Sequence, residues 1–276
     1  MKRWVRLTVM GSAVWALAAA GASGDYQFPG EDLARRAEIE RILKTAEIVE
    51  AKEIGTGVTR PYKVHLKGGD IECDACWKNP KGEMFGYLEG WQYEIAAYAM
   101  DKLLGINMIP PTVERDFKGK PGALQFWVTS EMSDLHRMEN EIKIPDEFAV
   151  RWTKQKYILR AFDSLIGNED RTQENVLYIK DWRMVLIDHS RSFRSTWKFT
   201  NRLMYGRNGI KGQFLFRMLP RAFVEKVEAL TFDQIKAAVG DYLTKAEINA
   251  ILKRRQLLLD EIADMIQEKG ESAVLY

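Results

Sequence analysis

The sequence predicts an α+β fold in which β-strands dominate the first half and α-helices the second. Short runs rich in β-branched and aromatic residues lie between residues 46 and 129, whereas the stretches after residue 145 mainly show the apolar periodicity of helices. Two further short apolar runs, near residue 180, predict a β-hairpin within the helical half. With 276 residues and 46% hydrophobic content, the chain can bury a substantial core in one bilobal domain or two small ones.

The amino terminus has the features of a secretory signal peptide. Lys2, Arg3 and Arg6 precede a largely apolar run over residues 7–20, and small residues follow this run. The run is too short to cross a bilayer, so we predict no transmembrane span. We expect residues 1–24 to be removed and the chain to be exported to a periplasmic, extracellular or secretory-lumen compartment. An uncleaved interfacial anchor is the alternative.

Three strands are predicted in the segment that follows. They cover residues 46–52, 62–66 and 71–77. The first two flank Gly55 and Gly57, and this G-x-G turn would let backbone N–H groups approach phosphate oxygens. An ordinary hairpin turn is the alternative interpretation.

A helix and two more strands are predicted next. Residues 87–104 carry apolar side chains at i+4 spacing, and Gly105 closes the pattern in the way that a helix end requires. Residues 106–115 and 124–129 are then predicted as strands.

The second half of the chain is predicted to be a helical scaffold around one hairpin. A helix over residues 145–166 ends at Gly167, and strands over residues 176–179 and 184–187 form the hairpin. A capping box beginning at Thr244 starts the last long helix, whose apolar stripe predicts core packing.

Acidic and amide residues flank the predicted hairpin at informative spacings. Asn175 follows Asp170 by five residues, Asp188 follows it by eighteen, and the hairpin returns Asp188 beside Asn175. Phosphoryl transfer needs such a set, because one carboxylate must face the nucleophile while an amide and a second carboxylate hold a metal ion. The alternative is that these are ordinary surface side chains, which the combination of helix, hairpin and spacing disfavours.

The order of residues in this region resembles that of atypical kinases. The motif N-x-D-R at residues 168–171 is followed by Asn175 and, after an apolar strand, by Asp-His at residues 188–189. This pattern is similar to that of HipA-like kinases, phosphatidylinositol 3/4-kinases and the secretory-pathway protein kinases of the Golgi. It differs from the H-R-D-x-x-x-x-N order of ordinary protein kinases. The resemblance is best over residues 157–193 and weaker over residues 45–115.

The resemblance implies a bilobal protein-kinase-like fold. Residues 25–132 would form a β-rich N-lobe with the hinge, and residues 133–276 a mainly helical C-lobe. Asp170 would be the catalytic base of an ATP-dependent reaction. Asn175 and Asp188 would bind Mg²⁺ or Mn²⁺.

A kinase-like site also needs a lysine on a strand and a glutamate on the next helix, which together hold the α- and β-phosphates. Lys78, at the end of the third predicted strand, and Glu94, on the following helix, fit these roles. Lys63 and Lys67 are rivals, disfavoured because Lys78 lies immediately before the predicted helix. A solvated surface charge is the alternative for each residue. Adenine would stack at a hinge near residues 131–132.

The cysteines and histidines do not predict a redox or zinc site. Cys73 and Cys76 fall in one predicted strand, where their Cα atoms would lie about 10 Å apart, beyond the reach of a disulfide. We expect small apolar fillers, with a disulfide across a β-bulge as the alternative. None of the three histidines has zinc-ligand spacing with the cysteines, and His189 is expected to shape the metal-binding loop.

The charge balance excludes an obvious nucleic-acid-binding surface. The formal net charge is +2, and removing the three positive charges of the first 24 residues leaves −1 for residues 25–276.

Taken together, the signal peptide and the kinase-like motifs predict an exported kinase that transfers the γ-phosphoryl group of ATP to a hydroxyl on a protein or small molecule. Two alternatives stay open: a nucleotide-binding pseudokinase adaptor, and a kinase-fold enzyme that transfers AMP.

Overall fold

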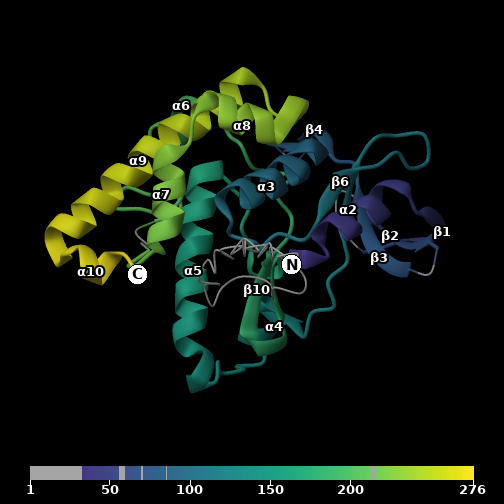
Figure 1. Ribbon diagram of the computed structural model, residues 1–276, viewed down its shortest axis with the longest axis horizontal. Helices are drawn as coiled ribbons and strands as arrows, with labels where there is room; N and C mark the ends of the chain where they lie inside the picture. Colours follow the sequence, from purple (N-terminus) through teal and green to yellow (C-terminus); the bar gives the residue numbers. More distant parts are fainter. Residues whose placement is uncertain (1–32, 56–59, 70, 85, 213–215) are drawn as a thin grey trace, which may run out of the picture.

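The protein has a sheet-rich part and a helical part that lie side by side (Figure 1). The computed structural model describes residues 33–55, 60–69, 71–84, 86–212 and 216–276. The predicted signal peptide and Gly57 lie outside these ranges. Within them, no helix is both long enough and apolar enough to cross a membrane.

A five-stranded antiparallel sheet forms the sheet-rich part, in the order β1-β2-β3-β7-β6. Its strands are β1 (Glu47–Glu53), β2 (Tyr62–Gly68), β3 (Ile71–Lys78), β6 (Thr112–Glu114) and β7 (Ala123–Phe126). Side chains alternate between the two faces along each strand. Val64, Leu66, Ala75 and Trp77 form one buried face against helix α2 (Arg36–Thr45). The opposite face of the sheet therefore carries the β3 side chains that alternate with Ala75 and Trp77.

A second hairpin lies between β3 and the next helix. It consists of β4 (Lys81–Met84) and β5 (Tyr87–Gly90), and helix α3 (Trp91–Leu104) follows directly. The predicted helix over residues 87–104 is therefore wrong for its first four residues, because their backbone pairs with β4. Gly86, with φ of +78°, makes the turn. Lys78 consequently does not lie immediately before the helix.

Two predicted strands are shorter than expected. Only Thr112–Glu114 of the segment 106–115 is a strand, since Pro110 and Pro111 lack the N–H group that a sheet ladder needs. The predicted strand over residues 124–129 is confirmed as β7, which ends at Phe126.

The helical part begins with a three-stranded sheet in the order β10-β9-β8. Its strands are β8 (Met132–Ser133), β9 (Val176–Ile179) and β10 (Arg183–Leu186). Helix α4 (Asp134–Glu139) follows β8, and the long helix α5 (Asp146–Ile166) runs beside the hairpin in Figure 1. The predicted helix over residues 145–166 and the predicted hairpin are thus confirmed.

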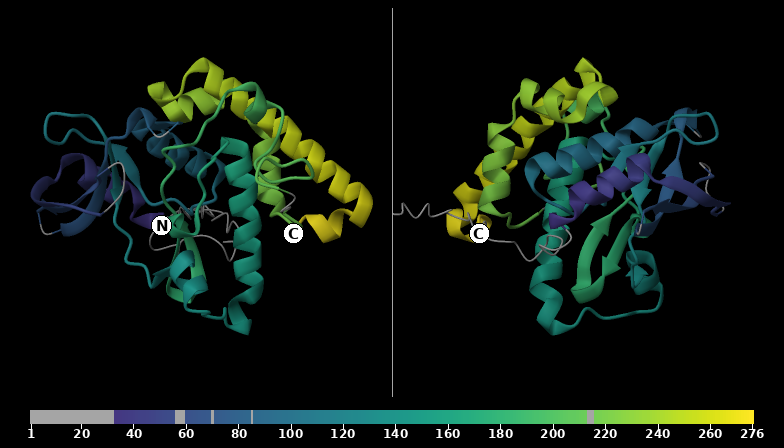
Figure 2. Two further views of the ribbon diagram at one scale, coloured as in Figure 1. Left: turned by 180° about the vertical axis from the view of Figure 1, so that it is seen from behind. Right: turned by 45° about the vertical axis from the view of Figure 1, so that its right-hand side comes forward.

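Helices complete the chain. They are α6 (Trp197–Thr200), α7 (Arg221–Ala229), α8 (Phe232–Val239), α9 (Lys245–Lys269) and α10 (Glu271–Val274), with single 3₁₀ turns at Gln173–Asn175 and Gly240–Tyr242. Lys180–Trp182 forms the turn between β9 and β10, with positive φ at Asp181 and Trp182. The predicted capping box is present, since the side chains and backbone groups of Thr244 and Glu247 bond reciprocally. Helices α9 and α10 form the outer edge of the molecule in both views of Figure 2.

The main core joins α3, α5, the hairpin and the C-terminal helices. Helix α3 contacts β6 and β7 on one side and α7 and α8 on the other, so it is buried nearly all round. It therefore links the two parts of the molecule. A charged residue on its buried surface must have a partner.

Candidate active site

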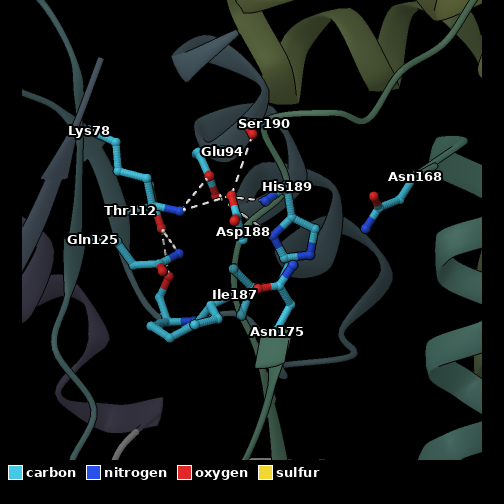
Figure 3. Close-up of polar contacts among 12 residues, drawn as sticks. Lys78, Glu94, Thr112, Gln125, Asn168, Asn175, Ile187, Asp188, His189 and Ser190 are labelled. Atoms are coloured by element: carbon cyan, nitrogen blue, oxygen red, sulfur yellow. Dashed lines mark hydrogen bonds and ion pairs between the residues drawn. The ribbon is translucent and has the colours of Figure 1, made fainter. Parts of the chain in front are cut away.

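A buried lysine with two carboxylate partners forms the centre of the candidate site (Figure 3). The Nζ atom of Lys78 lies 2.7 Å from Oε1 of Glu94 and 3.2 Å from Oδ1 of Asp188. The side chains of Lys78 and Glu94 are 10% and 1% exposed, whereas that of Asp188 is 41% exposed. The end of β3, the first turn of α3 and the loop after β10 thus meet at one point.

The charges of this group stabilise one another. Burial alone would lower the pKa of Lys78, but the carboxylates of Asp188 and Glu94 outweigh it and raise that pKa. Burial alone would raise the pKa of Glu94, but Lys78 and a hydrogen bond from His189 lower it. The backbone N–H of His189 donates that bond over 3.0 Å to Oε2 of Glu94. Lys78 is therefore held as a cation and Glu94 as an anion.

The other two candidate lysines lie elsewhere. Lys63 pairs with Asp74 over 2.7 Å, and Lys67 pairs with Glu72 over 2.8 Å. Both pairs are partly exposed and lie between the neighbouring strands β2 and β3. Neither lysine is bonded to Glu94.

Asp188 has an unusual backbone conformation. Its φ of +58° lies in the left-handed region, which few residues other than glycine adopt. The hydroxyl of Ser190 donates to its Oδ1 over 3.4 Å. Lys78 and Ser190 thus engage one oxygen of the carboxylate, and Oδ2 is left available to a cation.

Asp170 lies in the loop that follows α5. Gly167 ends that helix with φ of +64°, a conformation that suits glycine. The backbone N–H of Asp170 then donates to Oδ1 of Asn168 over 3.1 Å, and the Asp170 carboxylate pairs with Arg191 over 3.0 Å. Burial, the largest influence, raises the pKa of Asp170, Arg191 lowers it, and Asp188 raises it again.

Asn175 is brought beside Asp188 by the hairpin. The backbone N–H of Ile187 donates to the carbonyl of Asn175 over 3.1 Å, which continues the pairing of Val176 with Leu186. The side-chain amide nitrogen of Asn175 donates to the carbonyl of Asp170 over 3.2 Å. Its amide oxygen is therefore the atom left for a cation.

Arg171 organises the loop around Asp170. Its guanidinium donates to Asp163 (Nε–Oδ2 2.9 Å), and its Nη1 donates to the carbonyls of Asn175 and Ile187. Nη2 also donates to Nε2 of His189 over 2.8 Å. Because that ring nitrogen accepts, the imidazole proton lies on Nδ1. Burial, together with Arg171, lowers the pKa of His189, so the ring is neutral. Asp163 and His189 therefore brace the loop.

The glycine turn is described only in part. Gly55 has φ of +85°, and the backbone N–H of Ile54 bonds to the carbonyl of Pro61 over 2.8 Å at the base of the turn. These features begin a connection between β1 and β2 of which residues 56–59 lie outside the described ranges. A role of Gly55 and Gly57 in phosphate binding remains a prediction.

The two cysteines carry free thiols. Cys76 lies on the same face of β3 as Lys78, and burial raises the pKa of its thiol to about 11. Cys73 lies on the opposite face, against the apolar core below α2. The thiol of Cys76 is therefore protonated and unreactive at neutral pH.

The donor set suits a magnesium ion that also binds phosphates. Within the described ranges, no group of three or more His, Cys, Asp or Glu side chains could hold a metal by itself. Mg²⁺ usually takes only one or two carboxylates from the protein and completes its shell with substrate phosphates and water. The available oxygens of Asn175 and Asp188 fit that pattern.

A cavity of about 700 Å³ lies beside the expected hinge but apart from this group. Ile71, Cys73 and Phe126 line it, together with α2, so it opens on the α2 side of the sheet. It shares no residue with the group around Lys78, which faces the other way. The charged group, and not this cavity, therefore marks the candidate site.

Two residues of the site could not be found from the sequence. Arg191 contacts Asp170, and Glu89 on β5 holds Arg191. Glu89 was hidden because residues 87–90 were predicted to be helical. Arg191 was hidden because a single arginine in a loop carries no spacing signal.

The chain is distantly similar to one curated protein. No protein-family model matches it. It is 26% identical over 212 residues to Protein Rv2133c of Mycobacterium tuberculosis. The aligned region covers 67% of this chain and 72% of that protein.

A solved structure similar to this one confirms the fold. The chain is similar to Fam20 of hydra, solved with sugar, with a TM-score of 0.62 and 15% identity over 92% of this chain and 95% of that one. It also matches the proinflammatory kinase CtkA of Helicobacter pylori with a TM-score of 0.47 and 11% identity, over 83% of this chain and 97% of that one. The similarity to hydra Fam20 confirms the α+β, kinase-like fold with a sheet-rich and a helical part. The resemblance to HipA-like and phosphatidylinositol kinases stays a prediction.

Proposed function

We propose that this protein is an atypical kinase that transfers the γ-phosphoryl group of ATP to a hydroxyl. The observation that carries the proposal is the bridge from buried Lys78 to Glu94 on α3 and to Asp188 after β10. A kinase-like site requires this lysine–glutamate pair intact beside a metal-binding aspartate. A buried cation costs free energy unless its partners compensate it, and Glu94 and Asp188 supply that compensation for Lys78.

The residues of the site would divide the work as follows. Lys78 holds the α- and β-phosphates, and Glu94 holds Lys78 in place. Asn175 and Asp188 would hold Mg²⁺ or Mn²⁺ through their available oxygens. The bound ion would neutralise phosphate charge as the phosphoryl group moves.

Asp170 supplies the base. Its carboxylate orients the acceptor hydroxyl and takes the hydroxyl proton as the oxygen attacks the γ-phosphorus. Arg171 fixes the position of Asp170 relative to Asn175, because its guanidinium donates both to Asp163 and to the carbonyl of Asn175. Gly55 and Gly57 would let the β1–β2 turn approach the phosphates.

We also propose that the chain acts after export. A signal peptide is supported by three features of residues 1–24: a positively charged beginning, an apolar run and small side chains after that run. The acceptor is a protein or a small molecule.

Transfer of label from ATP tests the proposal. The purified chain is incubated with Mg²⁺ and with ATP labelled on either the γ- or the α-phosphate, alone and with a host extract. Label from the γ-phosphate should appear on the protein itself or on an extract component. Label arriving from the α-phosphate would show AMP transfer instead. Nucleotide binding without any transfer would show a pseudokinase.

A further inference from the structure

The β4–β5 hairpin is tied to the segment that follows Asp188. The backbone N–H of Gly90 donates to the carbonyl of Ser190 over 3.0 Å, and the guanidinium of Arg194 bonds to the carbonyl of Leu88. Between these two points Arg191 contacts Glu89. A hairpin of the sheet-rich part thus holds a segment that carries part of the candidate site.

Arg191 is constrained on three sides. Its Nε and Nη2 atoms both donate to Oε1 of Glu89, over 2.9 and 2.6 Å, and its guanidinium carbon lies 4.5 Å from the centre of the Tyr87 ring. Its remaining nitrogen, Nη1, lies 3.0 Å from Oδ2 of Asp170. Glu89 is only 3% exposed, so the anchor of the guanidinium is itself rigidly placed.

The contact engages one oxygen of Asp170 and leaves the other available. Arg191 bonds to Oδ2, while the Asp170 side chain stays 36% exposed. Oδ1 is the oxygen left for an acceptor hydroxyl. A carboxylate held at one oxygen has a defined orientation toward an acceptor at the other.

We propose that Arg191 is a positioning residue that orients the base Asp170, and that Glu89 on β5 acts through Arg191. The inference rests on the proposed function. In the reaction the acceptor oxygen bonds to the γ-phosphorus, the bond from that phosphorus to the bridging oxygen of ADP breaks, and the acceptor proton passes to Asp170. Arg191 neither gives nor takes a proton.

The neighbouring Arg194 shows what a structural arginine in this segment does. It pairs with Glu169, bonds to the Leu88 carbonyl and is only 7% exposed. These contacts already fasten the segment to the hairpin and to the loop after α5. Of the two arginines, Arg191 is the one bonded to the Asp170 carboxylate.

Hydrolysis of Mg-ATP by the full chain tests the inference, with water as the acceptor. Arg191→Gln should lower kcat by roughly 10²-fold, the cost of a misplaced reacting group, and leave the KM for ATP and the Mg-ATP thermal shift unchanged. Arg191→Lys should restore only part of the rate, because an ammonium cannot bridge Glu89 and Asp170 as a planar guanidinium does. Glu89→Gln keeps Arg191 and should lower kcat less, so it provides a second test that does not depend on the folding of Arg191→Gln.

A double-mutant cycle distinguishes positioning from a structural role. If Arg191 acts through Asp170, Arg191→Gln should cost nothing further in the Asp170→Asn background. Lys198→Gln is the matched control, since it removes an equal charge from an exposed site in the same segment, and it should keep wild-type kcat.

Three results would overturn the inference while leaving the proposed function intact. They are wild-type kcat in Arg191→Gln, losses that add in the double variant, and a rise in the KM for ATP that accounts for the whole effect. A wild-type chain that neither hydrolyses ATP nor transfers its γ-phosphate would overturn the proposed function and this inference with it.

Discussion

Lys78 shows how burial distinguishes one charged residue from its neighbours. Its side chain is 10% exposed and has two carboxylate partners, whereas Lys63, on the adjacent strand, is 38% exposed, pairs with the carboxylate of Asp74 and lies over the Trp127 ring. Exposed pairs of the second kind contribute about 0–1 kcal/mol. Loss of one partner from a buried group leaves an uncompensated charge and is far more costly.

Lys78→Met should therefore weaken Mg-ATP binding while Lys63→Met should not. Hydrogen bonds to charged groups contribute about 1.5–3 kcal/mol, which corresponds to a loss of roughly 10- to 100-fold in affinity. Isothermal titration of each variant with Mg-ATP measures the effect. Equal affinities in the two variants would show that Lys78 does not hold the phosphates.

Asp170 allows a second test at the residue scale. Asp170→Asn should keep the fold and most nucleotide affinity, since the residue faces the acceptor, and should lower phosphoryl transfer by roughly 10²-fold or more. Glu174→Gln is the control, because Glu174 is an exposed carboxyl in the same loop. Transfer of label from the γ-phosphate of ATP is measured for both variants. Undiminished transfer by Asp170→Asn would show that Asp170 is not the base.

At the scale of elements, the end of helix α3 carries a buried acid. Oδ1 of Asp101 accepts hydrogen bonds from the backbone N–H groups of Met108 and Ile109, over 2.9 and 3.3 Å, while Oδ2 has no partner. Burial, opposed by these bonds, raises the pKa of Asp101 from 3.8 to about 7. The carboxyl fixes the turn after the helix that also carries Glu94.

The raised pKa predicts a pH-dependent stability. Between pH 4 and 7 the folded chain holds a proton on Asp101 that the unfolded chain releases, so the free energy of unfolding should fall as pH rises through this window. The shift from 3.8 to about 7 corresponds to at most about 4 kcal/mol. Thermal unfolding of the wild type and Asp101→Asn should show a difference that changes with pH. A difference for Asp101→Asn that stays constant across this pH range would contradict the prediction.

At the scale of the whole molecule, the site is assembled from both parts of the fold. Lys78 comes from the sheet-rich part, Asp170, Asn175 and Asp188 come from the helical part, and Glu94 lies on the helix between them. A ligand that contacts both parts binds the folded chain and not the unfolded one. Such a ligand must raise the unfolding temperature.

Mg-ATP should therefore stabilise the wild-type chain, by about 2.7 kcal/mol at a ligand concentration 100 times the Kd. Asp188→Ala should lose most of this stabilisation, since it removes a metal ligand and a partner of Lys78. Asp260→Ala, an exposed change on α9, should keep it. A thermal-shift titration with and without a chelator measures all three proteins. Equal thermal shifts in the wild type and Asp188→Ala would show that Asp188 does not bind the metal ion.

Export is tested on the whole chain as well. Intact-mass measurement of protein recovered from its native host should show an amino terminus near Ser23 or Asp25, as cleavage after small residues requires. A chain beginning at Met1 in a soluble cytosolic fraction would refute the signal peptide.

The sequence by itself determined the features that depend on local spacing. The strands β2, β3 and β9, helix α5 and the α9 capping box follow from periodicity and end signals within short windows. The hairpin also places Asn175 beside Asp188, because only a few residues separate its strands.

Only the tertiary structure decided which distant residues meet. Arg191 lies 102 residues from Glu89, and Arg194 lies 106 residues from Leu88. Nothing local in either segment specifies such contacts, because they depend on how the sheet-rich part packs against the helical part. The same packing brings Lys78 to Asp188 across 110 residues.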